Sequence, residues 1–172
     1  MSEHTRPEAG DIGFCKIKGA GGKVARYGMA ILDDACRYEH AYLVLDNDEV
    51  IEAMPGGARI RPLNGRLGTG FAYARLPLDP WQISHLVEGA RDLQGTPYSF
   101  LDYLSLSAVH LGVPTPMLRK YISDSGHMIC SQLVDFALCN YAGYHLFDDG
   151  RLPQDVTPGD LFYRSIELGE VW

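Results

Sequence analysis

Cys130 and its neighbours have the residue types and the spacing that thiol chemistry requires. The cysteine opens an apolar stretch of helical periodicity and follows polar residues at 123–125, which are good helix N-caps. We therefore expect Cys130 in the first or second turn of a helix, where unpaired backbone N–H groups and the helix dipole favour an anion. Such a position lowers the pKa of a thiol, and the same N–H groups can stabilise an oxyanion. Cys130 is thus a candidate nucleophile.

A base and an orienting carboxylate are predicted on a β-hairpin far upstream. His40 opens one β-rich stretch, and Glu52 lies in the next, twelve residues later. An even spacing about a tip near Asp46 puts both side chains on one face of the sheet, whereas a tight two-residue turn at 47–48 would send them to opposite faces. On one face, Glu52 can orient the imidazole, and His40 can take the proton of Cys130.

Two other interpretations of Cys130 remain open. It can pack as a small apolar core residue, which is the ordinary position of a cysteine and the one expected for Cys139. His127 stands three residues before Cys130, which is a spacing seen in metal sites, but only Cys139 and His145 are near enough in sequence to complete one. We expect neither a metal nor another cofactor.

The elements around these residues are expected to be strands first and helices afterwards. Strands are predicted at 10–17, 40–45, 49–54, 58–63 and 71–78. Helices are predicted at 24–36, 80–93, 98–112 and in the Cys130 segment. The stretch TPGDLFYRSI at 157–166 is predicted to be a last strand or extended segment. This order indicates an α+β fold with helices packed on one face of an antiparallel sheet.

Length and composition limit the class of protein. The 172 residues suit a single domain, 1–172, with residues 1–9 as a loose N-terminal arm. A net charge of −7 argues against nucleic acid as a partner, and the absence of an apolar run of about 18 residues argues against a membrane span. The N-terminus lacks the apolar core of a signal peptide, so a cytoplasmic location is expected, unless the protein leaves by lysis or another signal-independent route. The four cysteines contain no CxxC pair and are expected to be free thiols.

Four stretches in a fixed order carry a family resemblance. They are HAYLVLDNDEVIEAMPGG (40–57), GTPYS (95–99), ICSQLVDFA (129–137) and TPGDLFY (157–163). Together they resemble the circularly permuted papain-like cysteine hydrolases of the NlpC superfamily, especially the YiiX-like branch. In conventional members the cysteine motif precedes the histidine, whereas the order is reversed here.

The resemblance implies a permuted papain-like fold and a role for each matching residue. Cys130 would be the nucleophile, His40 the base and Glu52 the polar third residue. Tyr98 would line the site and donate to the substrate or the oxyanion. Gln132, in the same part of the site, departs from the small residue usual at that point of the cysteine motif.

The activity that the resemblance implies is hydrolysis of a peptide amide bond through a thioester, with bacterial cell-wall peptide as the leading substrate. One alternative is an ester, thioester or lipid acyl hydrolase or acyltransferase with the same triad. The acyltransferase branch carries a second histidine where this chain has Glu52, which weakens that alternative. The other alternative is an inactive papain-like binding module. The oligomeric state is not predicted.

Overall fold

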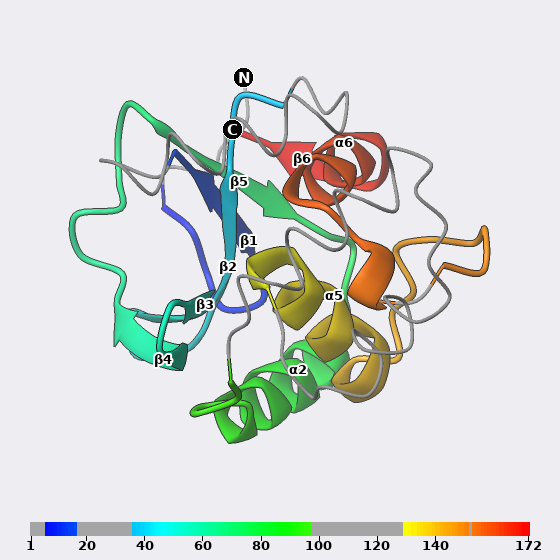
Figure 1. Ribbon diagram of the computed structural model, residues 1–172, viewed down its shortest axis with the longest axis horizontal. Helices are drawn as coiled ribbons and strands as arrows, with labels where there is room; N and C mark the ends of the chain where they lie inside the picture. Colours follow the sequence, from blue (N-terminus) through cyan, green and yellow to red (C-terminus); the bar gives the residue numbers. More distant parts are fainter. Residues whose placement is uncertain (1–5, 17–35, 98–128, 152) are drawn as a thin grey trace.

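In the part of the chain that the structure describes, six strands form one antiparallel sheet, and three helices pack against it. The computed structural model describes residues 6–16, 36–97, 129–151 and 153–172 (Figure 1). The strands are β1 (Ile12–Cys15), β2 (His40–Val44), β3 (Glu49–Met54), β4 (Gly57–Pro62), β5 (Phe71–Arg75) and β6 (Glu170–Val171). Their order across the sheet is β4-β3-β2-β1-β5-β6. The helices are α2 (Pro80–Asp92), α5 (Cys130–Tyr141) and α6 (Pro158–Leu168), with a short 3-10 helix η1 (Pro153–Asp155) before α6. The predicted α+β fold is confirmed.

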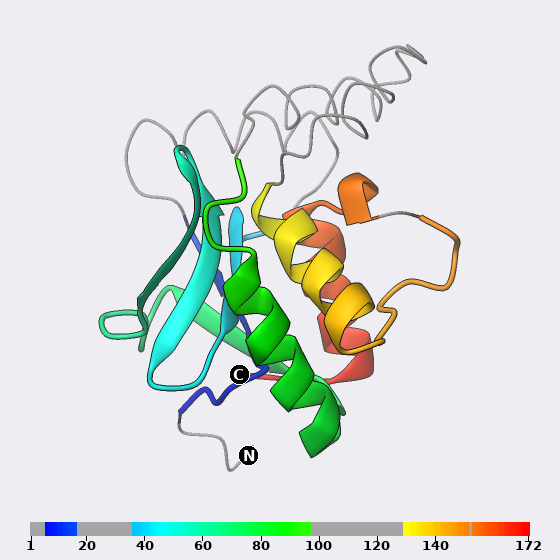
Figure 2. The same ribbon diagram turned by 90° about the horizontal axis from the view of Figure 1, so that it is seen from below.

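The helices cover one face of the sheet, as Figure 2 shows, and the side chains of the strands alternate accordingly. The helix-facing strand positions are filled by Ile12, Phe14, Ala41, Leu43, Ile51, Ala53, Ala72 and Ala74. A smaller buried cluster on the opposite face contains Cys15, Tyr42, Val44, Val50, Leu63 and Tyr73. His40 has the parity of Tyr42, and Glu52 has the parity of Val50. Both polar side chains therefore belong to the face away from the helices.

Helix α2 begins at a complete N-terminal cap and holds α5 in place. The Asp79 side chain accepts from the N–H of Gln82, the Gln82 side chain accepts from the N–H of Asp79, and Pro80 occupies the first turn. A Cβ atom at Gly89 would lie 2.2 Å from the ring of Tyr141 on α5. Glycine at this position therefore permits the close approach of the two helices that sets α5 over the sheet.

The predicted strand at 157–166 is wrong, because these residues form α6. Thr157 is its N-cap: its hydroxyl accepts from the N–H of Asp160, and the Asp160 side chain accepts from the N–H of Thr157. Pro158 then fills the first helical position, where its missing N–H costs nothing. The Thr-Pro-x-Asp pattern is thus a helix start, and the true last strand, β6, follows the helix and pairs with β5.

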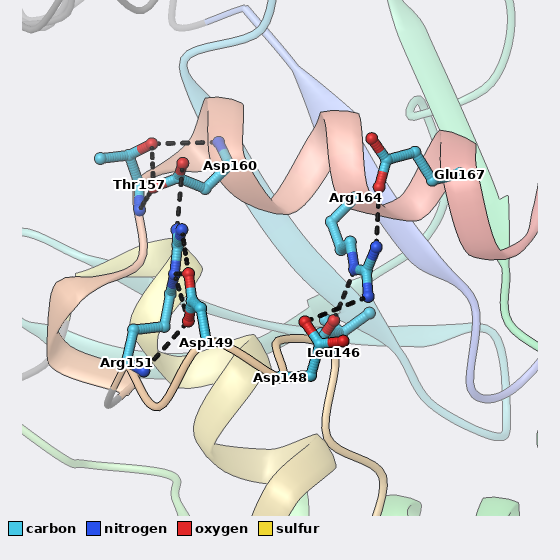
Figure 3. A network of polar contacts seen from close by, with 8 residues as sticks. All are labelled: Leu146, Asp148, Asp149, Arg151, Thr157, Asp160, Arg164 and Glu167. Carbon is cyan, nitrogen blue, oxygen red and sulfur yellow. Dashed lines mark hydrogen bonds and ion pairs between the residues drawn. The ribbon is translucent and has the colours of Figure 1, made fainter.

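Two arginines connect the loop before α6 to this helix through ion pairs and a hydrogen bond. Arg151 forms ion pairs with Asp149 at 2.6 Å and with Asp160 at 3.2 Å (Figure 3). Arg164 donates to the carbonyl of Leu146 at 2.7 Å and also pairs with Glu167 at 2.8 Å. The same loop also contacts α5, because the Ser131 hydroxyl on that helix donates to the carbonyl of Val156 at 2.7 Å.

Some expectations fall on residues beyond the described ones. The helices predicted at 24–36 and 98–112 lie outside the described residues, apart from Cys36 at the end of the first range. Residues 1–5 of the expected N-terminal arm also lie outside them, whereas Arg6 pairs with Asp48 at 2.7 Å and Pro7 is buried. Over the described parts of the chain, no helix is long and apolar enough to cross a membrane.

Candidate active site

Cys130 is the first residue of α5. Ile129, with an extended backbone, is the N-cap, and its carbonyl accepts the first helical hydrogen bond from Leu133 at 3.0 Å. The side chain of Gln132 turns back and accepts from the N–H of Ile129, also at 3.0 Å. The helix therefore starts later than the polar residues at 123–125 suggest, and these lie outside the described residues. Cys130 consequently stands at the positive end of the helix dipole.

The turn of the β2–β3 hairpin combines a tight turn with a bulge. Asn47 and Asp48 both have positive φ, 57° and 58°, as in a two-residue type I′ turn. Glu49 donates its N–H to the carbonyl of Asp46 at 3.3 Å, but Leu45 also donates to the carbonyl of Glu49 at 2.8 Å. Leu45 and Asp46 thus both face Glu49, and this one-residue bulge offsets the register by one.

The bulge brings His40 and Glu52 to the same face of the sheet. Val44 pairs with Val50, so the hairpin is symmetric about position 47 rather than 46. The tight turn that would separate the two side chains is present, but the bulge reverses its effect. His40 Nε2 lies 2.8 Å from Glu52 Oε2, and both residues are buried. The carboxylate among the apolar residues of β3 therefore has a partner and does not face solvent.

The thiol of Cys130 reaches this pair where β2 and β3 separate. The two strands pair only at Leu43 and Val44 of β2, whereas β3 and β4 pair along their whole length. On β2, Val44 donates its N–H toward β1, so by the alternation of an antiparallel ladder the N–H of Ala41 points toward the opening. The Cys130 sulfur accepts hydrogen bonds from Ala41 N–H and from Ser131 N–H, and it also hydrogen-bonds to the His40 ring.

Charge in the site favours an ion pair between cysteine and histidine. Burial lowers the pKa of His40, but the contacts with Cys130 and Glu52 outweigh it and raise that pKa to about 9. Burial raises the pKa of Cys130, but the imidazolium charge and the hydrogen bonds from His40, Ala41 and Ser131 bring it below that of an ordinary thiol. The two groups titrate as a coupled pair, and the lowered pKa of Cys130 together with the raised pKa of His40 favours the thiolate–imidazolium form over the neutral pair.

Arg66 is part of the site, although no sequence motif indicates it. Its guanidinium donates to Glu52 Oε1 at 2.6 Å, so each carboxylate oxygen of Glu52 has its own partner. Burial raises the pKa of Glu52, but the hydrogen bonds from His40 and Arg66 outweigh it and lower that pKa to about 2. Glu52 is therefore ionised throughout the physiological pH range. Arg66 comes from the glycine-rich turn between β4 and β5, where sequence alone gives no reason to expect a site residue.

Cys15 is a second cysteine beside the site that sequence reasoning did not single out. It pairs directly with His40 in the β1–β2 register, so the two side chains share one face. Burial raises the pKa of the Cys15 thiol to about 12, against the lowering effect of Arg66. Cys15 is thus a neutral thiol, in contrast to Cys130.

Of the two other predicted site residues, Tyr98 and Gln132, the structure describes only Gln132. Tyr98 lies outside the described residues. Gln132 is 2% exposed, and its side-chain oxygen is bound to the N–H of Ile129, so this atom caps the helix that carries the cysteine. Within the described part of the chain, no group of three or more His, Cys, Asp or Glu side chains could hold a metal ion.

Comparison with known proteins bears on the fold. No protein-family model matches this chain, and neither does any curated protein. Among solved structures, the chain is similar to the crystal structure of metalloprotein YiiX from Escherichia coli O157:H7, a DUF1105 protein. The TM-score is 0.58 at 20% sequence identity, and the match covers 96% of this chain and 87% of that chain. The protein therefore has the fold of YiiX, an antiparallel sheet with helices packed on it.

Proposed function

We propose that this protein is a cysteine hydrolase that cleaves a peptide amide bond through a thioester, with Cys130 as nucleophile, His40 as base and acid, and Glu52 as the orienting carboxylate. The observation that carries the proposal is the continuous chain of contacts from the Cys130 sulfur through the His40 ring to Glu52. A helix N-terminus, a histidine and a buried carboxylate in this order activate a thiol.

The reaction follows from these contacts. Because His40 Nε2 is bonded to Glu52, Nδ1 is the ring nitrogen left for Cys130. The thiolate attacks the carbonyl carbon, and backbone N–H at the start of α5 helps to hold the oxyanion. The imidazolium gives its proton to the leaving amine, which leaves a thioester on Cys130 and a neutral His40. His40 then takes a proton from water, the resulting hydroxide attacks the thioester, and the acid product leaves with the thiolate and imidazolium restored.

The similar Escherichia coli structure is of a protein named a metalloprotein. The donors in this site do not fit a resident metal, because the two oxygens of Glu52 are bonded to Arg66 and His40, and Nε2 of His40 is bonded to Glu52. The proposed reaction has no step that passes through a metal.

Bacterial cell-wall peptide is the substrate that the family resemblance favours, and a substrate panel tests it. Stem peptides of the cell wall and other peptide amides should be compared with matched esters, thioesters and phospholipids, and intact mass should be recorded for an acyl group on Cys130. Amide turnover that is lost in Cys130→Ala supports the proposal. Turnover confined to esters or lipids would indicate an acyl hydrolase or acyltransferase, and an unreactive Cys130 with no turnover would indicate a binding module.

A further inference from the structure

We propose that Arg66 is a positioning residue of this site: it fixes Glu52 toward His40, and its permanent charge keeps Glu52 ionised when His40 gives up its proton. This inference rests on the proposed function for its consequence in turnover. The effect of Arg66 on the pKa of His40 does not depend on any substrate.

The two carboxylate oxygens of Glu52 accept from two different donors. Arg66 binds Oε1 at 2.6 Å, and His40 binds Oε2 at 2.8 Å. A carboxylate held by its first oxygen cannot rotate freely, so the second oxygen remains aimed at the imidazole. A charge-assisted contact of this length is among the stronger hydrogen bonds of proteins.

Arg66 is itself held in place by its neighbours. Its guanidinium carbon lies 4.6 Å from the centroid of the Tyr42 ring. The Tyr42 hydroxyl donates to the Tyr73 hydroxyl at 2.9 Å, and the Tyr73 hydroxyl donates to the backbone carbonyl of Arg66. The Tyr42 ring in turn lies over Gly13, where a Cβ atom would be 2.1 Å from it. These contacts already hold the guanidinium in place. Its hydrogen bond to Glu52 therefore costs little additional side-chain conformational entropy.

Arg66 also balances the charge of the site during the proposed reaction. In the resting site, the positive charge on His40 compensates the buried carboxylate of Glu52. When His40 protonates the leaving amine it becomes neutral, and an unpaired carboxylate that is only 8% exposed would be costly. Arg66 cannot lose its charge, so it stabilises Glu52 in both states of His40. A fixed cation beside the pair also makes the imidazolium a stronger acid, which helps proton transfer to an amine.

The test measures the ring pKa of His40 by NMR in Arg66→Met, Arg66→Lys and Arg61→Met. The His40 signal is assigned by its loss in His40→Ala. Arg61 is an exposed arginine on β4, so its replacement controls for the change in net charge. Loss of the fixed cation in Arg66→Met should raise the His40 pKa by about one, a tenfold increase in proton affinity. Arg66→Lys should restore most of the wild-type value, and Arg61→Met should leave it unchanged.

A purely structural role for Arg66 predicts that the pKa of His40 falls in Arg66→Met instead of rising. If its loss only loosened the site, His40 would separate from Glu52 and its pKa would fall toward the ordinary value of about 6.5. A fall, or no change in folded Arg66→Met, would overturn the inference. Turnover provides a separate readout: the amide kcat should fall by about tenfold more than the kcat of an activated ester, which needs less protonation of its leaving group. If no substrate is turned over, the proposed function fails while the NMR result still decides the role of Arg66.

Discussion

The register of the paired residues Leu43–Ile51 and Val44–Val50, continued by one position, puts Glu52 across from Tyr42, yet its Oε2 atom lies 2.8 Å from Nε2 of His40, the diagonal neighbour on the same face. Diagonal neighbours are within reach of long side chains. The arrangement leaves Tyr42 to hold Arg66 against the other oxygen of Glu52. Three neighbouring positions on this face of β2 and β3 thus have linked roles. His40 is the histidine, Glu52 is its carboxylate, and Tyr42 supports the arginine that binds this carboxylate.

The first prediction concerns the reactivity of Cys130. At pH 6, brief treatment of the native protein with iodoacetamide should modify Cys130 at least about tenfold faster than the other cysteines, because only a thiolate reacts. Burial raises the pKa of Cys15 to about 12 and that of Cys139 to about 11, so these thiols should stay neutral. Peptide mapping by mass spectrometry measures the rates. Equal, slow labelling of all native thiols would show that Cys130 is an ordinary buried core cysteine.

The second prediction separates the roles of His40 and Glu52. His40→Ala should lower kcat by about 10²–10⁴-fold, because the base and acid of the reaction is removed. Glu52→Gln should retain the fold and part of the activity, because the amide oxygen can still accept from the imidazole. Steady-state kinetics on the substrate found in the panel, with circular dichroism to check the fold, gives the comparison. Activity of Glu52→Ala equal to that of wild type would remove Glu52 from the mechanism.

The third prediction is the pH dependence of kcat/KM. Activity should rise with pH as Cys130 ionises to form the ion pair with His40, at a pH below the pKa of an ordinary thiol. It should fall again near pH 9, where His40 loses its proton. In Glu52→Gln the carboxylate that raises the pKa of His40 is gone, so the alkaline limb should move to lower pH. An alkaline limb at the same pH in both proteins would show that it does not report His40.

The fourth prediction concerns Asp135, a carboxylate on α5 that the proposed mechanism does not use. Asp135 is 3% exposed, and its Oδ1 atom has no hydrogen-bond partner in the described structure. Arg151, which lies near enough to influence it, is held by Asp149 and Asp160 (Figure 3). Burial raises the pKa of Asp135 to about 6, despite the lowering effects of His145, Arg151 and Cys139.

The sign of the effect of Asp135 on stability follows from this raised pKa. Between about pH 4 and 6 the folded protein binds the proton more tightly than the unfolded chain, so stability falls as pH rises through this window. Above it, the charged carboxylate costs on the order of 2–3 kcal/mol. Asp135→Asn should therefore raise the free energy of unfolding by about 1–2 kcal/mol at pH 8 and by much less at pH 4.5. Urea unfolding at both pH values measures this, with the exposed Asp148→Asn as control; a gain of the same size at both would contradict it.

The sequence by itself determined the strands β1 to β5, the helices α2 and α5, and the residues whose types could do chemistry. Alternating β-rich stretches with turn residues between them predict β1 to β5, and an Asp-Pro start followed by apolar helical spacing predicts α2, because these signals are local. The same local reasoning failed at 157–166, where the capping pattern of Thr157 outweighs the β-like composition. Residue types, spacing and order along the chain distinguish Cys130, His40 and Glu52.

Only the tertiary structure decided how these residues meet. The face on which Glu52 lies depends on a bulge at Leu45 and Asp46, and a shift of one residue in register would have reversed it. The approach of Cys130 depends on where β2 and β3 separate and on how α2 holds α5 above them. Arg66 joins the site from a loop with no motif, since the contacts that hold it come from strands distant in sequence. Such long-range contacts are fixed by packing of the whole chain, and no short stretch of sequence encodes them.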